Sequence, residues 1–162
     1  MRIRPVRPEE FDAAGELVVT AYRALGDDAV AEPAYETELR DVAGRAGAAV
    51  VLVAVEGDEV LGCVTYVPDR HSPLAEHDLD GVASMRMLAV SPTAQGRGIG
   101  QALARACVER ARAEGCTQVV LHSASTMATA HRLYSRLGFE RVPDLDWTPV
   151  PAVSLFGFRL SL

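Results

Sequence analysis

A glycine-rich segment from Gln95 to Gly100 constrains the fold of this chain more than any other part of the sequence. It follows an apolar, strand-like run and precedes a helical pattern from Ile99 to about Glu114. Glycines alternate at positions 96, 98 and 100, and without Cβ atoms their N–H groups can turn inward around an anion. The helix start adds unpaired N–H groups and the positive end of the helix dipole. The segment therefore predicts a strand–loop–helix unit that binds a pyrophosphate, to which Arg97 can add a charged fork.

The spacing of these glycines separates the loop from the common nucleotide-binding fingerprints. A dinucleotide loop, G-x-G-x-x-G, would need its third glycine at Gln101, and the ribose-binding acid would fall near Val120, where none is present. The sequence also contains no lysine, so all 16 basic residues are arginine. This excludes a Walker-type P-loop and a pyridoxal-phosphate enzyme, because both require a lysine. A turn that uses glycine only for close packing remains the alternative.

Hydrophobic periodicity along the rest of the chain predicts a mixed α/β fold around a single sheet. We expect helices over 8–25, 35–45, 99–114 and 126–137, and strands over 3–6, 48–55, 60–67, 84–90, 118–123, 139–142 and 154–160. Residues 68–81 form a polar loop, and the Pro-rich stretch 143–151 connects two strands. No repeat or linker divides the chain, so residues 1–162 are expected to form one domain.

Composition narrows the class of partners. The net charge is −6 without a basic block, which excludes nucleic acid as the expected partner and mildly favours a cationic amine. No apolar run is long enough to span a bilayer, and the start lacks a signal peptide, so we expect no membrane partner and a cytoplasmic location. The scattered Cys63, Cys107 and Cys116 indicate reduced thiols and no metal site.

Three segments together resemble the GNAT superfamily of N-acetyltransferases. Gln95-Gly96-Arg97-Gly98-Ile99-Gly100 matches its acetyl-CoA motif, Q/R-x-x-G-x-G/A; Met87 to Pro92 resembles the preceding strand; and Ala130 to Phe139 resembles its A-x-x-x-Y-x-x-x-G-F segment. The resemblance covers nearly the whole chain and is most specific from Met85 to Val142. It implies a mostly antiparallel sheet of six to seven strands with flanking helices and one splayed strand pair.

The resemblance also implies how the chain would bind and use acetyl-CoA. Backbone groups of Leu88 and Val90 would pair with the pantetheine arm like an added strand, and the glycine loop would hold the pyrophosphate. The amine would attack the thioester directly, without a covalent acyl-enzyme. The expected cofactor-binding residues are Leu88, Ala89, Val90, Gln95, Gly96, Arg97, Gly98, Ile99, Gly100, Gln101, Ser125 and Tyr134.

The expected catalytic residues are Tyr134 and His122. The Tyr134 phenol would hydrogen-bond or protonate the departing CoA sulfur. Many relatives carry a glutamate on the strand before the loop as the proton acceptor, but here Ser84 takes its place. His122 is one replacement, because imidazole titrates near neutrality. The alternatives are a relay through water and five side chains of the polar loop, namely His71, Glu76, His77, Asp78 and Asp80.

Two residues near the motif depart from an easy interpretation. Arg86 lies on a strand expected to be largely buried, so it either pairs with an acid of the fold or holds a substrate carboxylate. Met127 replaces an asparagine of many relatives, which removes one expected cofactor contact.

The leading function is therefore N-acetyl transfer from acetyl-CoA to a small-molecule or peptide amine. The missing strand carboxylate keeps a non-catalytic acyl-CoA sensor as the alternative, and a general nucleotide-binding protein is the third reading. The resemblance allows both a monomer and a homodimer.

Overall fold

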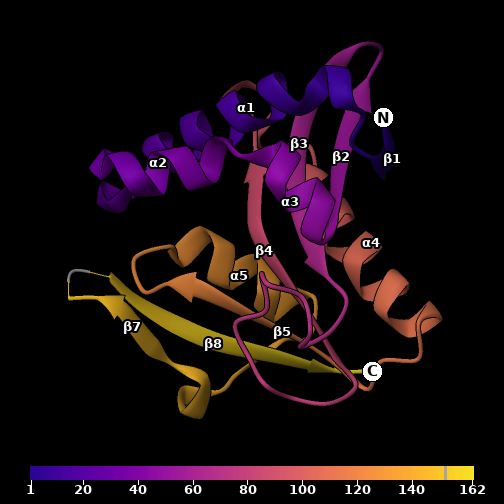
Figure 1. Ribbon diagram of the computed structural model, residues 1–162, viewed down its shortest axis with the longest axis vertical. Coiled ribbons are helices and arrows are strands. Elements are labelled where there is room, and N and C mark those ends of the chain that lie inside the picture. Colours follow the sequence, from indigo (N-terminus) through magenta and orange to yellow (C-terminus); the bar gives the residue numbers. More distant parts are fainter. Residues whose placement is uncertain (152) are drawn as a thin grey trace.

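An eight-stranded, mostly antiparallel sheet forms the centre of the computed structural model (Figure 1). The structure describes residues 1–151 and 153–162, with all of their side chains except that of Asp28. The described strands are β1 (Arg2–Pro5), β2 (Val50–Glu56), β3 (Glu59–Val67), β4 (Val82–Val90), β5 (Gln118–Ala124), β6 (Glu140–Arg141), β7 (Trp147–Val150) and β8 (Val153–Ser161). Their order in the sheet is β1-β2-β3-β4-β5-β8-β6, and β7 pairs with β8.

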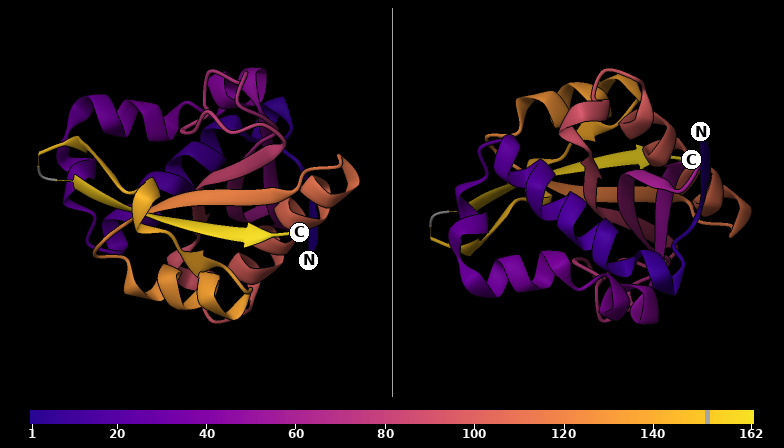
Figure 2. Two further views of the ribbon diagram at one scale, coloured as in Figure 1. Left: turned by 90° about the horizontal axis from the view of Figure 1, so that it is seen from below. Right: turned by 90° about the horizontal axis from the view of Figure 1, so that it is seen from above.

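Helices cover both faces of this sheet. The described helices are α1 (Phe11–Ala24), α2 (Pro33–Arg40), α3 (Val42–Ala48), α4 (Ile99–Ala113) and α5 (Ala128–Arg136), with short 3₁₀ turns at Pro8–Glu10, Asp28–Ala31, Pro92–Ala94 and Pro143–Leu145. Helices α1, α2 and α3 lie on one side of the sheet, and α4 and α5 lie on the other side (Figure 2). Among the described residues, no helix is long and apolar enough to cross a membrane.

Strand β2 shows how the two faces share the core. Its residues alternate between two buried clusters, as the period of two in a strand requires. Val51, Val53 and Val55 pack in the cluster with α1, α2 and α3. Leu52 and Ala54 pack in the cluster with α4, Tyr134 and Phe158. The β-branched run in this part of the sequence is therefore continuous because the strand is buried on both faces.

The structure differs from the sequence-based expectations in three places. The helix expected over 35–45 is two helices, because Asp41 ends α2 and its carboxylate accepts a hydrogen bond from the Gly44 N–H at the start of α3, 2.8 Å away. The Pro-rich stretch 143–151 is not only a connection, because it contains a 3₁₀ turn and strand β7. That extra strand brings the sheet to eight strands, where six to seven were expected.

Helices α1 and α2 touch backbone to backbone at Gly15. A Cβ added there would lie 2.5 Å from the Arg40 carbonyl oxygen. We expect Gly15→Ala to lower the free energy of unfolding by ~1–3 kcal/mol, since the backbone of α2 would have to move. Gly47 in α3 is the matched control, because its added Cβ meets nothing within 4 Å. Gly47→Ala should stabilise the protein by ~0.5–1 kcal/mol through helix propensity. Urea unfolding measures both changes, and a change of the same sign in the two variants would contradict this packing.

Candidate active site

Strands β4 and β5 separate after three paired positions. They run parallel and pair at Val82–Gln118, Ala83–Val119 and Ser84–Val120, after which no described strand pairs with this edge of β4. Strand β5 continues along β8 up to Ala124. The residues of β4 from Met85 to Val90 therefore keep one backbone edge open, as the splayed pair expected from the sequence requires. This edge can accept an extended ligand by strand addition.

A β-bulge in β4 lies next to this opening. Cys63 of β3 pairs with Ala89 and Thr65 pairs with Arg86, so β4 has one more residue than β3 between these pairs. Met87 in the bulge has a φ of 55° and is the only described residue besides glycine with a positive φ. The bulge lets Arg86 and Met87 both face the side of α1 and α2, where Arg86 pairs with α2 and Met87 joins the buried cluster.

The start of α4 presents an open group of backbone N–H donors. Gly98 occupies the N-cap position with a φ of 76° and provides no capping side chain. The first described helical bond at this end runs from Ala102 N to the Gly98 oxygen, so the N–H groups of the first turn are unused within the helix. Gly96 also has a φ of 76°, and a Cβ added at either glycine would meet nothing within 4 Å. This geometry fits a diphosphate.

Gly100 and Arg97 have different roles around the start of α4. A Cβ at Gly100 would lie 3.4 Å from Leu133 of α5 and 3.5 Å from Val90, so this glycine brings the start of α4 close to the end of β4. Arg97 forms an exposed ion pair with Glu56, with Nη2 3.0 Å from a carboxylate oxygen. Because exposed pairs contribute little, Arg97 can exchange this partner for a phosphate at small cost.

Tyr134 of α5 lies in the core on the α4 side of the sheet. Its side chain is 7% exposed, and its ring packs against Phe139 and Phe158 with centroid distances of 5.9 and 5.7 Å. Burial raises the pKa of the Tyr134 phenol, so the hydroxyl stays protonated at neutral pH. A group in this state can donate a hydrogen bond to a leaving sulfur but cannot act as a base.

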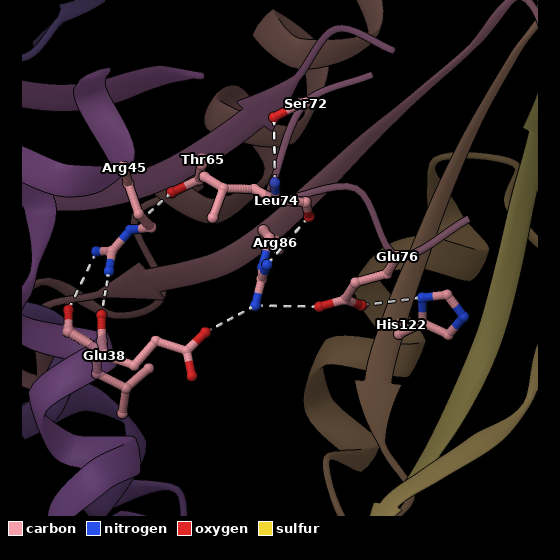
Figure 3. A network of polar contacts seen from close by, with 9 residues as sticks. Glu38, Arg45, Thr65, Ser72, Leu74, Glu76, Arg86 and His122 are labelled. Atoms are coloured by element: carbon pink, nitrogen blue, oxygen red, sulfur yellow. Dashed lines mark hydrogen bonds and ion pairs between the residues drawn. The ribbon is translucent and has the colours of Figure 1, made fainter. Parts of the chain in front are cut away.

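Four charged side chains meet on the opposite face, where β4 and β5 part (Figure 3). Arg86 Nη2 lies 3.1 Å from Glu38 Oε1 of α2 and 3.1 Å from Glu76 Oε1 of the 68–81 loop. The other oxygen of Glu76 lies 3.2 Å from His122 Nδ1 of β5. Arg86 and His122 are each two residues beyond the last β4–β5 pair. The Glu76 carboxylate therefore bridges the two strands where their backbone bonds stop.

Both ring nitrogens of His122 are engaged. Nε2 lies 2.8 Å from the Leu145 carbonyl oxygen, to which it must donate, and Nδ1 faces the Glu76 carboxylate. Burial lowers the pKa of His122, but hydrogen bonds to Glu76 and to the Leu145 carbonyl together raise it above the ordinary value. Burial raises the pKa of Glu76, but His122 and Arg86 bring it below the ordinary value. Both nitrogens of His122 thus face acceptors and Glu76 faces two donors, an arrangement that favours the charged form of each group.

This pairing has a predictable pH dependence. The pKa of His122 is raised in the folded protein, so the stabilisation is complete below the unfolded value near 6.5 and is lost as pH rises through the folded value. We expect His122→Gln to lower the free energy of unfolding by ~1–2 kcal/mol at about pH 6, with a smaller difference at about pH 9. Urea unfolding of both proteins at each pH measures this difference. Because His77 and Asp146 are present in both proteins, subtracting one free energy of unfolding from the other cancels their contribution. A difference that does not change with pH would contradict the assignment.

The structure brings most of the predicted residues to the region between the end of β4 and the start of α4. Leu88, Ala89 and Val90 lie on β4, Gln95 to Gly98 lie in the exposed loop, and Ile99, Gly100 and Gln101 form the first turn of α4. Ser125 is exposed at the end of β5, where its N–H donates to Ser154 O. Tyr134 and His122 lie on opposite faces of the sheet. The role of His122 as a proton acceptor stays a prediction, and its hydrogen bonds do not favour that role.

Sequence reasoning missed the residues that position this network. Arg45 of α3 is buried, and its guanidinium donates to the Glu38 and Leu39 carbonyls at 2.6 and 3.1 Å and to Thr65 Oγ1 at 3.1 Å. It thereby holds the end of α2, and with it Glu38, against the sheet. An arginine in an otherwise apolar and glycine-rich segment was the available signal, but its partners could not be read from the sequence.

Comparisons with known proteins agree with this geometry. A family model described as the acetyltransferase (GNAT) family matches residues 14–139. N-acetyltransferase 8B of Rattus norvegicus is 33% identical over 99 residues, which are 59% of this chain and 43% of that protein. Mycothiol acetyltransferase of Saccharopolyspora erythraea is 37% identical over 62 residues, 38% of this chain and 20% of that protein. The chain thus spans less than half the length of the first curated relatives it matches.

Solved structures share the fold along the whole chain. A GCN5-related N-acetyltransferase from Kribbella flavida superposes with a TM-score of 0.70 at 26% identity, covering 99% of this chain and 97% of that one. A GNAT-family acetyltransferase from Staphylococcus aureus superposes with a TM-score of 0.79 at 11% identity, covering 99% and 98%. The family model, the glycine loop at the start of α4 and the splayed β4–β5 pair all agree, and the chain belongs to the GNAT acetyltransferase family.

Proposed function

We propose that this protein transfers an acetyl group from acetyl-CoA directly to a primary amine. The observation that carries the proposal is the uncapped start of α4, where Gly96 and Gly98 leave the backbone N–H groups open beside the end of β4. These donors would hold the CoA diphosphate. The open edge of β4 at Leu88 and Val90 would align the pantetheine arm and direct the thioester into the gap between β4 and β5.

The chemistry requires few groups from the protein. The amine nitrogen forms the new bond to the thioester carbonyl carbon, the C–S bond breaks, and the products are an amide, CoA thiol and a proton. Tyr134 would donate a hydrogen bond to the departing sulfur, a role supported by the effect of burial on its pKa. Ser84, the last β4 residue paired with β5, carries no carboxylate, so we propose that the ammonium proton leaves through water.

The names of two relatives support an amine as the acceptor. N-acetyltransferase 8B and a GCN5-related N-acetyltransferase are named for transfer to nitrogen. We keep the cytoplasm as the proposed compartment and either a monomer or a homodimer as the proposed assembly. The described residues contain no group of three or more His, Cys, Asp or Glu side chains that could hold a metal ion.

Two measurements test the proposal. Calorimetric titration with CoA, NAD and ATP should give binding of CoA and neither of the others, and a thiol-release assay with acetyl-CoA and a panel of amines should give turnover. Binding of NAD or ATP without CoA would contradict the cofactor assignment. Tight CoA binding without turnover on any amine would instead indicate an acyl-CoA sensor.

A further inference from the structure

We infer that Arg86 and His122 form a binding site for a carboxylate of the acceptor, and that Glu76 of the chain itself occupies this site in the free protein. The acceptor would then be an amine that also carries a carboxylate, such as an amino acid or a related compound. This inference rests on the proposed function, because it names the substrate class of the same site. Glu76 would act as an internal competitor for that substrate.

The first argument is the convergence of two cationic donors on one carboxylate. Arg86 and His122 come from different strands, and each lies two residues past the last β4–β5 pair. Arg86 Nη2 lies 3.1 Å from Glu76 Oε1, and His122 Nδ1 lies 3.2 Å from Glu76 Oε2. The Leu145 carbonyl holds His122 Nε2 at 2.8 Å, so the ring orientation that presents Nδ1–H to the gap is fixed. The two donors are thus arranged around a carboxylate at the opening where the thioester would enter.

The second argument is an unused donor on Arg86. Its Nε is buried and has no hydrogen-bond partner among the described residues. Nε and Nη2 lie on the same edge of a guanidinium, which can take both oxygens of one carboxylate. Glu38 and Glu76 each use only Nη2, and the Leu74 carbonyl uses Nη1 at 3.1 Å. A ligand carboxylate is not attached to the loop, so it could accept a hydrogen bond from the Nε–H that Glu76 leaves unpaired.

The third argument is how Glu76 reaches the site. It belongs to residues 68–81, which contain no helix or strand. The loop contacts the rest of the described chain through a few bonds, such as Ser72 Oγ to the Ala48 oxygen at 3.0 Å and Arg86 to the Leu74 oxygen. Glu76 can therefore withdraw without unfolding any regular element. Its side chain is 21% exposed, whereas that of His122 is 5% exposed, so the carboxylate is the accessible member of the pair.

The charge balance favours exchange over simple loss. Arg86 and His122 carry two positive charges, and Glu38 and Glu76 carry two negative charges. Withdrawal of Glu76 alone would leave the largely buried His122 imidazolium without its partner, which is costly. A substrate carboxylate would restore the balance, while a neutral amide would not. The site should therefore discriminate between an amino acid and its carboxamide.

Direct binding can be measured without any acetylation. We expect succinate, which has no amine, to bind the Glu76→Ala protein at least ~tenfold more tightly than wild type, since the internal carboxylate no longer competes. The probe is the ¹H–¹⁵N signal of Arg86 Nε–H, which should move on titration. Asp78→Ala in the same loop is the matched control, because Asp78 pairs with Arg70 and should leave the affinity unchanged. Adding Arg86→Gln to Glu76→Ala should remove the binding.

Glu76→Gln preserves the shape of the side chain and should change succinate affinity in the same direction, so it replaces Glu76→Ala if that variant unfolds. Equal succinate affinity in wild type and both variants, or binding that leaves the Arg86 signal in place, would show that Glu76 only fastens the loop. Either result would overturn the inference.

The activity arm separates this inference from the proposed function. With acetyl-CoA, Glu76→Ala should lower KM for amino acids about tenfold and leave KM for their carboxamides unchanged. Failure to bind CoA would overturn the proposed function, and the succinate titration would still decide whether the carboxylate site exists. Normal CoA binding and turnover, with equal KM changes for acids and amides, would overturn the carboxylate site alone.

Discussion

Tyr134→Phe is expected to lower kcat about 100-fold while CoA affinity changes less than about twofold. The hydroxyl is the only group that the substitution removes, and the ring would keep its packing against Phe139 and Phe158. Burial keeps the phenol protonated, so in the proposed mechanism the wild-type protein has a hydrogen-bond donor for the leaving sulfur. Steady-state kinetics with acetyl-CoA and an accepted amine, together with calorimetric CoA titration, measure the two effects.

Tyr66→Phe provides the matched control for Tyr134→Phe. Tyr66 is also buried, but its hydroxyl donates to Glu114 Oε2 at 2.7 Å, at the end of α4 far along the helix from the glycine loop. Its loss should lower stability by ~1 kcal/mol without changing kcat. If Tyr134→Phe retains full kcat, or if both substitutions lower kcat equally, the Tyr134 hydroxyl does not assist the leaving group.

Gly98→Ala is expected to weaken CoA binding at least ~tenfold, equivalent to the loss of one charge-assisted hydrogen bond. Alanine avoids the φ of 76° that Gly98 adopts, so the loop would relax and turn its N–H groups away from the diphosphate. Any methyl group that remained in place would occupy the open space at the start of α4. Calorimetric titration with CoA measures the change.

Gly26 allows the backbone effect to be separated from the effect on the ligand. It has a φ of 75°, and a Cβ added there also meets nothing within 4 Å, but it follows α1. Gly26→Ala should therefore lower the free energy of unfolding by ~1 kcal/mol, about as much as Gly98→Ala, and leave CoA affinity unchanged. Comparable losses of affinity in both variants would mean that CoA binding does not depend on the loop at the start of α4.

The elements around the candidate site that the sequence located well are those encoded by neighbouring residues. Glycine spacing and helical periodicity located α4, which was expected over 99–114 and is found over Ile99–Ala113. The polar loop at 68–81 was also predicted from neighbouring residues alone. By contrast, β7 was missed because prolines at both ends of 143–151 indicate a connection, while the strand depends on pairing with β8. Local patterns do not encode such partners.

The charge network shows the same limit at the level of single side chains. Arg86 was recognised as unusual on a buried strand, and the structure pairs it with acids on α2 and on the loop. Glu38 lies 48 residues away in sequence, so only the folded sheet brings the two together. Likewise, the Leu145 carbonyl that fixes His122 comes from a 3₁₀ turn in the stretch 143–151, which the sequence predicted only as a connection. The chemical type of these residues was readable, whereas their geometry was not.

The extra residue in β4 has a consequence for how this chain can change in evolution. Met87 shifts the alternation of the strand, so side chains before and after it follow different phases. Deleting Met87 would only remove the bulge, so Leu88, Ala89 and Val90 would keep their faces and their register with β3, and the second side chain that β4 turns toward α1 and α2 would be lost. Among homologues, length variation should therefore be found in the 68–81 loop and, within the stretch from Ser84 to Val90, only as the presence or absence of the bulge residue.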